Sequence, residues 1–363
     1  MGREEHRFPC DSCGSDLRFD PSDDRLVCDH CGNVEPIEHG PWERSNAIIE
    51  QDFDSAIEAG FGTAEMEDAR VSQCPNCGAR VEFDPNIHAT ECPFCATPVV
   101  TDTGATRQIK PRGVIPFMLD ESEARAEMTS WLGSLWFAPN GLQDYARKGR
   151  TMNGVYTPCW TFDADTRSRY RGQRGTVYYE NRSVNRNGKR ETVRVPKVRW
   201  HAVSGHVARF FDDVLVVAST ALPGKFRTAL VHWDLTRLEP YRPEYLAGFR
   251  SEAYTVELQE AFGEAREIMD RQILRDIRFD IGGDQQRVDQ VETQISDVTF
   301  KHILAPVWLA AYKYRGKSYR FVVNGQTGQV IGERPWSAWK IAFAVMAAMI
   351  LAAIMGFLYA QGA

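Results

Sequence analysis

The chain has 363 residues, of which 43% are hydrophobic and 25% are charged, and its formal net charge is −6. This length excludes a single compact core and predicts two or three domains, while the composition is ordinary for a folded protein. The charge is unevenly spread. Residues 1–72 hold 18 Asp and Glu against 6 Lys and Arg, whereas residues 167–199 hold 11 Lys and Arg against 2 Glu.

The first residues, Met1 to Arg7, contain no apolar stretch, so we expect no signal peptide. The N-terminal part is therefore expected to stay in the cytosol. Because thiols are kept reduced there, clustered cysteines indicate metal binding before they indicate disulfides.

Eight of the nine cysteines follow one pattern twice, two C-x2-C pairs separated by 14 residues. Gly14 matches Gly78, and Phe19-Asp20-Pro21 matches Phe83-Asp84-Pro85, so one unit has been duplicated. Four thiolates complete the tetrahedral coordination of zinc and leave no open position for catalysis. We predict two structural zinc ions, in ribbons over residues 1–40 and 73–100. The expected ligands are Cys10, Cys13, Cys28 and Cys31 in the first ribbon, and Cys74, Cys77, Cys92 and Cys95 in the second.

Residues 41–72 are expected to form a helical linker between the ribbons. Their apolar positions at Ile48, Ile49, Phe53, Ile57 and Phe61 have helical spacing. His30 lies inside a cysteine pair and is a competing ligand on spacing alone, although an exposed position is the simpler interpretation.

Residues 110–335 are predicted to form an α+β body with two helices. One helix begins at Asp120 or Ser122, and the other covers residues 256–276. The sections 151–235 and 284–332 are β-rich, with tight turns expected at Asn187-Gly188 and Asn324-Gly325. Pro158-Cys159-Trp160 recurs as Pro306-Val307-Trp308, which leaves open whether the body contains two related β subunits.

Residues 341–360 carry no charge and are long enough to cross a bilayer as a helix. Trp336 and Trp339 precede this run and Tyr359 closes it, as in interfacial aromatic belts. Basic residues stand only on its upstream side. The fold class predicted is therefore α+β, with two N-terminal zinc ribbons, a β-rich body and one C-terminal transmembrane helix whose N-terminal bulk faces the cytosol.

The basic stretch over residues 167–199 allows several interpretations. The simplest interpretation is the solvated face of β-strands. The functional interpretations are a contact for anionic lipid or an acidic protein, and a nucleic-acid site. The stretch could also pair with the acidic N-terminal region of the same chain. The ribbons themselves are poor candidates for nucleic acid, because their region is strongly acidic. The basic residues are Arg167, Arg169, Arg171, Arg174, Arg182, Arg186, Lys189, Arg190, Arg194, Lys197 and Arg199.

No motif for catalysis stands out. The sequence contains no complete phosphate-binding loop, and His201 and His206 would lie on opposite faces of a strand. Cys159 has apolar neighbours and is expected to pack as a small hydrophobic residue. We therefore expect no enzyme and no small-molecule substrate.

Several of these features together resemble a known bacterial family, the tail-anchored TFIIB-type zinc ribbon-containing proteins. They are the two ribbons, the terminal anchor, and the segments Val155–Asp163, Pro306-Val307-Trp308 and Asn324–Gly328. The resemblance implies a place in membrane-stress operons, beside phage shock protein A and an SPFH-type protein. Some relatives carry the label primosomal protein N′, a replication helicase, which the missing phosphate-binding loop contradicts here.

The function expected from the residues and the resemblance is a non-enzymatic adaptor that recruits protein partners to the cytosolic face of the bacterial inner membrane. The alternative is a membrane-tethered zinc-ribbon protein that binds nucleic acid.

Overall fold

The computed structural model describes residues 8–37, 48–61, 66–82, 89–95, 97–100, 105–139, 152–186, 189–230, 232–314, 317–334 and 336–362. The molecule is β-rich, with five α-helices and two short 3-10 helices in these ranges. The Asn187-Gly188 turn and the Phe83-Asp84-Pro85 copy of the repeat lie outside the described residues.

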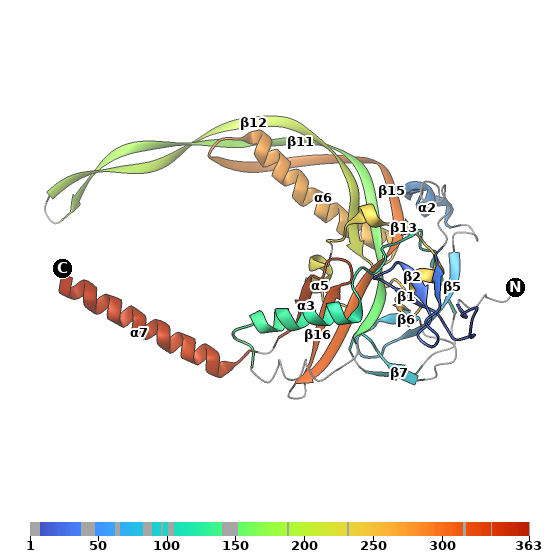
Figure 1. Cartoon of the computed structure of the whole chain (residues 1–363). Helices are drawn as coiled ribbons and strands as arrows, with labels where there is room; N and C mark the ends of the chain where they lie inside the picture. The colour runs from blue at the N-terminus through green and yellow to red at the C-terminus, as the bar shows by residue number, and fades with distance from the viewer. Residues whose placement is uncertain are drawn as a thin grey trace.

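A nine-stranded sheet organises the body, and three very long strands dominate it (Figure 1). They are β11 (Asn153–Arg186), β12 (Lys189–Val217) and β15 (Gln285–Tyr314). β11 lies in the middle and pairs antiparallel with both others. The sheet runs in the order β12-β11-β15-β10-β13, with β10 (Gly113–Val114) parallel to β15.

The long strands bend where they leave the body. The pairing register of β11 shifts around Asp163 against both of its neighbours. Asp213 in β12 and Asp297 in β15 have φ of 53° and 52°, an uncommon conformation for residues other than glycine. Such bulges bend and twist a sheet locally. The strands consequently curve away as a narrow extension (Figure 1).

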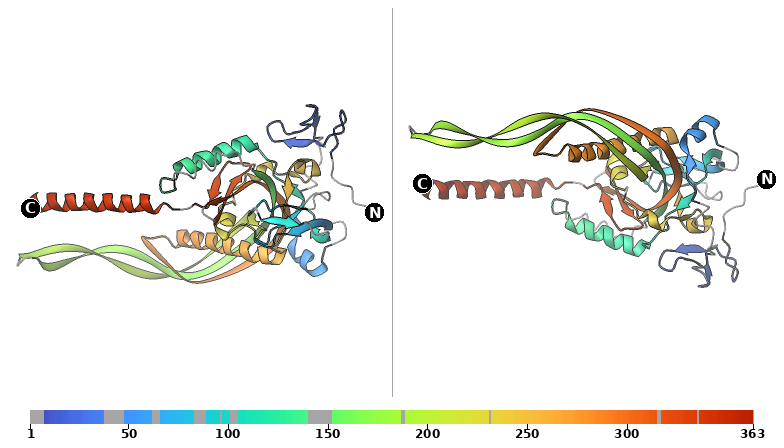
Figure 2. Two further views of the ribbon diagram at one scale, coloured as in Figure 1. Left: turned by 90° about the horizontal axis from the view of Figure 1, so that it is seen from below. Right: turned by 90° about the horizontal axis from the view of Figure 1, so that it is seen from above.

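The extension ends as a two-stranded ribbon. β15 pairs with β11 only as far as Gly175, while β11 and β12 continue pairing to Arg186 and Lys189. We call residues 176–186 of β11 and 189–199 of β12 the arm. In both views of Figure 2 the arm and the C-terminal helix point away from the body at the same end, and the N-terminal strands lie at the other end.

Helix α6 (Leu258–Ile281) covers one face of the three long strands. Its buried residues recur every three or four positions, which forms one apolar stripe. This stripe packs against Trp160, Phe162 and Phe300 of the sheet. The buried residues are Leu258, Ala261, Ala265, Met269, Ile273, Ile277 and Ile281.

Helix α3 (Glu121–Ser134) begins at Asp120, one of the two caps predicted. The Asp120 side chain accepts from the Glu123 amide, and the Glu123 side chain accepts from the Asp120 amide, so the two form a capping box. The helix packs beside β16 (Lys317–Asn324) and β17 (Val330–Gly332). The remaining body elements are β4 (Gln51–Asp52), β13 (Glu239–Pro240), β14 (Arg250–Ser251), α5 (Gly224–Ala229), η2 (Leu235–Arg237) and η3 (Pro243–Leu246).

Some expectations need correction. Among the described residues of the expected helical linker (48–61 and 66–72), only Phe53–Ala59 form a helix, α2, because Asp52 caps it and Gly60 follows it with φ of 71°. Met66–Gln73 form strand β5 instead. The body also contains α5 beyond the two helices expected. The segments Pro158-Cys159-Trp160 and Pro306-Val307-Trp308 lie on neighbouring strands of one sheet, where Pro158 opposes Leu304.

Candidate metal centres and membrane helix

The first group of four cysteines lies at the loops of a small sheet made of β1 (Arg18–Asp20), β2 (Arg25–Val27) and β3 (Val34–Pro36). The Sγ atoms of Cys10 and Cys31 are 3.6 Å apart, and those of Cys13 and Cys28 are 3.5 Å apart. All four sulfur atoms lie within 4.8 Å of one another. The first sequence pattern therefore closes into one compact donor set.

The second group has the same geometry. The Sγ atoms are 3.6 Å apart in the pair Cys74 and Cys95 and also in the pair Cys77 and Cys92. The cysteines lie next to the ends of strands β5, β6 (Arg80–Glu82), β7 (Ala89–Glu91) and β8 (Pro98–Val100), while β9 (Ala105–Ile109) pairs with the other half of β5. We call residues 8–37 the first unit and residues 66–100 the second unit.

Tight turns hold the cysteine pairs in place. In three of the four pairs a glycine follows the second cysteine, and its amide donates to the carbonyl oxygen of the first cysteine at 2.8–3.0 Å. Gly14, Gly32 and Gly78 have φ of 72°, 74° and 76°. Because side chains disfavour this left-handed region, glycine is the residue that fits these three turns.

The two sulfur groups fit metal ions. A Zn–S bond of about 2.3 Å separates the sulfurs of a tetrahedral site by about 3.8 Å, whereas a disulfide brings them to about 2.05 Å. All nine cysteines lie in the described part of the chain and are free of disulfides. The two groups can therefore hold two metal ions, consistent with zinc. His30 is exposed and lies outside the first group.

The charge balance of the first group also favours a cation. The backbone amide and hydroxyl of Ser15 lower the pKa of the Cys13 thiol to about 6, which favours the thiolate that metals bind. The amide of Asn33 lowers the pKa of Cys31, but the neighbouring sulfurs of Cys13, Cys10 and Cys28, together with desolvation, outweigh it and the pKa rises to about 12. Four thiolates thus repel one another unless a cation lies between them.

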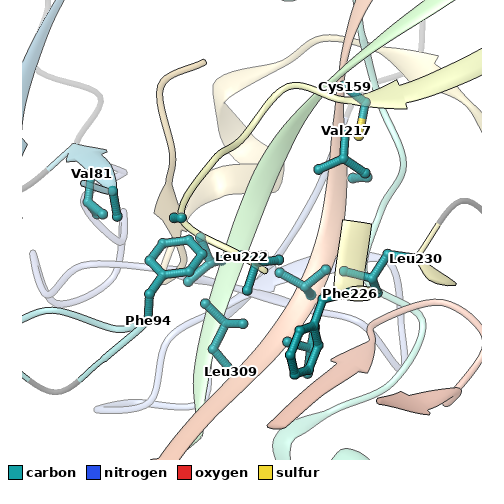
Figure 3. Close-up of a cluster of buried hydrophobic side chains, with 14 of the residues drawn as sticks. Val81, Phe94, Cys159, Val217, Leu222, Phe226, Leu230 and Leu309 are labelled. Carbon is teal, nitrogen blue, oxygen red and sulfur yellow. The ribbon is translucent and has the colours of Figure 1, made fainter. Parts of the chain in front are cut away.

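The second unit is part of the hydrophobic core of the body. Figure 3 shows Val81 and Phe94 of this unit in one cluster with Leu222, Phe226 and Leu309 of the body. Cys74, Cys92 and Cys95 themselves belong to this cluster and are buried. Loss of the metal would therefore open the core and not only a surface loop.

The first unit also packs against the body, through β1. Phe19 is 0% exposed, its amide donates to Ala247 at 3.0 Å, and its ring meets that of Tyr245 edge to face at 5.2 Å. The opposite side of the unit faces solvent, where Cys13 and Cys31 are exposed. The unit also carries the exposed residues Asp11, Asp16, Asp23, Asp24 and Asp29, of which Asp29 pairs with Arg18 and Asp23 with Arg25.

Helix α7 (Ala338–Gly362) contains the predicted apolar run. Its segment Ala338–Tyr359 is long and apolar enough to span a membrane, and none of it is buried inside the structure. Trp339, at its first turn, is 87% exposed. An exposed helix of this composition has no apolar partner within the described chain, which is consistent with a membrane anchor.

The basic stretch divides into two parts. Arg167, Arg169 and Arg171 point to the open face of the three-stranded section, whereas Arg174 is held by the carbonyl oxygen of Ile281. The remaining seven basic residues belong to the arm. Those with described side chains are exposed, namely Arg182, Arg190, Arg194, Lys197 and Arg199; the side chains of Arg186 and Lys189 lie outside the described set. The arm and the acidic first unit lie at opposite ends of the molecule, so they do not pair within this structure (Figure 2).

The remaining candidates do not form a site. Cys159 is completely buried among apolar side chains, as predicted (Figure 3). His201 and His206 are exposed on β12, and their spacing of five places them on opposite faces of the strand.

A buried ionic network at the bend of the sheet was not predicted from the sequence. The Lys301 ammonium lies 2.7 Å from a carboxylate oxygen of Asp213 and 2.9 Å from one of Glu50, and its side chain is 8% exposed. Thr299 donates to the other oxygen of Glu50 at 2.6 Å. Burial, together with the nearby Glu50 carboxylate, raises the pKa of Asp163 to about 7. Lys301 therefore supplies the positive charge that this group of carboxylates needs.

Removing this ammonium will destabilise the fold. We expect Lys301→Met to lower the free energy of unfolding by about 3–5 kcal/mol, because it leaves buried carboxylates without a counter-ion. The loss in free energy of unfolding will be larger at pH 8 than at pH 5.5, because at the lower pH Asp163 binds a proton in the folded state. Thermal unfolding of the detergent-solubilised protein measures the effect. Lys225→Met, which removes an exposed ion pair with Glu333, is the control and should cost at most about 1 kcal/mol.

A second buried carboxyl group lies where the second unit joins the body. Glu252 is buried, accepts a hydrogen bond from the Ser219 hydroxyl at 2.5 Å, and pairs through its backbone with Val81. Burial raises its pKa to about 8. Its other carboxyl oxygen has no hydrogen-bond partner among the described residues. In the folded protein Glu252 therefore favours its protonated form up to a higher pH than an exposed glutamate does.

The pH dependence of stability follows from this shift. An acid whose pKa is raised from 4.5 to about 8 stabilises the fold less and less as the pH rises through that interval. We expect Glu252→Gln, which keeps an acceptor for Ser219, to flatten this decline and to melt higher than the wild type at pH 9. Melting curves at pH 5, 7 and 9 test this, with the exposed Glu267→Gln as control. Parallel profiles for Glu252→Gln and the wild type would contradict the assignment.

Comparison with known proteins identifies one similar chain. The sequence is 27% identical over 343 residues to the uncharacterized protein YdjG of Bacillus subtilis (strain 168), covering 92% of each chain. No family model matches the sequence. No solved structure matches it either. Because the likeness to YdjG covers nearly the whole chain, it extends well beyond the cysteine patterns.

Proposed function

We propose that the protein is a non-enzymatic adaptor with two structural zinc ions, anchored by residues 341–360 in the bacterial cytoplasmic membrane. In this proposal the two units are zinc ribbons, the body lies on the cytosolic side, and a protein partner is recruited to the membrane surface. Complete four-cysteine sets support a structural role for the metal, since they leave no coordination position for a substrate.

The observation that supports recruitment most is the exposed acidic side of the first unit. Residues 8–37 hold seven Asp and Glu against two Arg, and this unit lies at the end of the molecule away from α7 (Figure 2). A surface that projects away from the anchor is accessible to a soluble partner. Its charge favours a partner with a basic surface. By resemblance, that partner is a phage shock protein A or SPFH-type protein.

Charge removal by Asp→Asn changes, which keep the shape of each side chain and leave all eight cysteines in place, tests the proposal. The full chain is extracted in detergent from its native membrane and used to capture partners, which mass spectrometry identifies. The variant Asp11→Asn, Asp16→Asn, Asp29→Asn should lose a partner that the wild type retains. The control variant Glu260→Gln, Glu267→Gln, Asp270→Asn removes three exposed charges from α6 and should retain it. An identical set of partners in all three samples would count against recruitment by this unit.

The basic arm supports a second candidate, nucleic-acid binding at the membrane. A two-stranded β-ribbon fits the major groove of DNA, and basic residues provide most of the non-specific affinity. This function predicts a gel shift of duplex DNA by the detergent-solubilised protein that weakens steeply between about 50 and 200 mM salt. It also predicts that the shift disappears when the arm is neutralised. Absence of a shift at low salt rules out this candidate.

A further inference from the structure

The arm is a long ribbon without a neighbouring strand. From Thr176 to Arg186, β11 pairs only with β12 in the described part of the chain, which leaves both edges of the ribbon open. At about 3.3 Å per residue, its 11 residue pairs extend about 35 Å. A two-stranded ribbon of this length has no hydrophobic core of its own, so contact with a surface outside the body would stabilise it.

The arm is basic on both faces. Residues 176–199 contain seven Lys and Arg against two Glu. Opposed residues of an antiparallel pair share a face, so Arg190 and Arg194 lie on one face and Arg182, Lys197 and Arg199 on the other. Only Lys197 has an ion-pair partner on the described arm, Glu180. The arm therefore presents positive charge in whichever way it is turned.

Tyrosines accompany the arginines on each face. The Arg194 guanidinium lies 5.1 Å from the centre of the Tyr179 ring, and that of Arg199 lies 5.0 Å from the Tyr178 ring. Tyr179 is more than half exposed. Aromatic rings beside cations are typical of protein surfaces at the level of lipid headgroups, where one end of the ring is apolar and the other is wet.

The direction of the arm favours a lipid surface over a soluble partner. The arm extends past the first turn of α7 at the same end of the molecule, in all three views (Figures 1 and 2). With α7 inserted, the bilayer surface lies at the start of this helix, near Trp336, Trp339 and Lys340. The arm would then meet the bilayer. Its open, charged edges cannot enter the hydrocarbon, so it has to lie along the surface.

The connection to α7 permits this arrangement. Among the described residues, hydrogen bonds join the start of α7 to the body at only two places. Ser337 donates its amide to Phe137 at 2.8 Å, and Lys340 donates its ammonium to Ala138 at 2.9 Å. The rest of the helix is exposed. Few described contacts therefore fix the angle between α7 and the body, and a change of this angle does not require the core to open.

We propose that the arm, residues 176–186 and 189–199, lies along the headgroups of anionic phospholipids and forms a second membrane contact besides α7. The charge distribution of the whole molecule agrees with this, since the basic arm is at the anchor end and the acidic first unit is at the far end. A membrane with negative surface charge attracts the former and repels the latter. The inference rests on membrane insertion of α7, which belongs to the proposed function, but not on any protein partner.

Energy transfer to lipid tests the contact in the full chain. A fluorescent donor is attached to Asn181→Cys, and the unmodified chain provides the background labelling of native thiols. Proteoliposomes contain a trace of lipid-linked acceptor in phosphatidylcholine, with or without about one-third phosphatidylglycerol. We expect higher transfer with phosphatidylglycerol and a return to the phosphatidylcholine value in 0.5 M salt, since salt screens surface attraction.

Two variants make the result specific. The arm variant carries Arg182→Gln, Arg190→Gln, Arg194→Gln and Lys197→Gln, and should lose the dependence on phosphatidylglycerol. Each basic residue near an anionic surface increases the affinity for that surface about fivefold, so four residues together increase it several hundredfold. The control variant carries the same number of changes on the exposed side of α6 and should keep the dependence. Its changes are Arg266→Gln, Arg271→Gln, Arg275→Gln and Arg278→Gln.

Flotation of the same samples tests membrane anchoring by α7 separately from lipid contact of the arm. If the wild type does not float with phosphatidylcholine vesicles, anchoring by α7 fails and the arm proposal fails with it. If it floats but transfer is equal in both lipids, only the arm proposal is overturned. A gel shift of DNA by the arm in that case would assign the arm to nucleic acid instead.

Discussion

We expect the replacement of Cys74 and Cys77 with serine to remove one of the two proposed zinc ions and to unfold the body. These ligands lie in the second unit, whose sulfurs share a core with Phe226 and Leu309. Structural zinc contributes about 10–16 kcal/mol in small zinc-binding peptides, which is comparable with the whole stability of a typical domain. We therefore expect a cooperative loss of structure and not a local change. Elemental analysis by mass spectrometry and thermal unfolding in detergent measure the two effects.

Two further cysteine variants serve as comparisons for this result. Cys13→Ser with Cys31→Ser will also remove one zinc ion but lower the melting temperature less, because these cysteines are exposed. Cys159→Ala will retain both ions, since this buried cysteine lies outside both sulfur groups. A wild-type protein with far fewer than two zinc ions per chain would contradict the metal assignment. So would a second-unit variant that melts together with Cys159→Ala.

Placing two lysines in the middle of α7 will release the protein from the membrane. Leu351→Lys with Ile354→Lys adds about 2.5–3.5 kcal/mol for each charge at the centre of a spanning helix. Both side chains are exposed on the structure, so the changes leave the packing of the body intact. We expect most of the protein to move from the membrane pellet to the soluble fraction. Extraction with alkaline carbonate followed by immunoblotting of both fractions measures this.

The position of the charge provides the control. Gln361→Lys adds a charge near the end of α7, where a lysine side chain reaches the aqueous interface. This variant should stay in the membrane after the carbonate wash. If the double variant also stays, α7 does not span the bilayer, and both the anchor and the orientation proposed for the arm are wrong.

The metal centres and α7 were accessible from sequence because their signals are local. Two cysteines separated by two residues reach one ion whatever the rest of the chain does, and Gly14 or Gly78 marks the turn between them. A run of uncharged residues specifies a spanning helix in the same way. Neither signal says which face of a unit docks on the body. The contacts of Phe19 and Phe94 with distant residues therefore had to come from the structure.

The network around Lys301 shows why other parts were not predicted. Lys301 and Glu50 are 251 residues apart, and each looks like an ordinary surface residue in its own segment. One local signal existed, since Lys301 follows Phe300 and precedes a run of apolar residues in a strand. The length of the arm was hidden for a related reason. A turn signal at Asn187-Gly188 indicates a hairpin but not how far its strands continue to pair, because long-range register depends on neighbouring strands.

The position of β12 at the edge of the sheet has a consequence for solubility. Among the strands that the structure describes, it pairs with β11 alone over its 29 residues, so its outer row of amides and carbonyls is open to another strand. Edges of this length invite intermolecular sheet formation unless something opposes it. Pro196 interrupts the row of donors, and mutual repulsion of the lysines and arginines keeps copies apart. The same charges thus protect the chain from aggregation before it reaches any membrane.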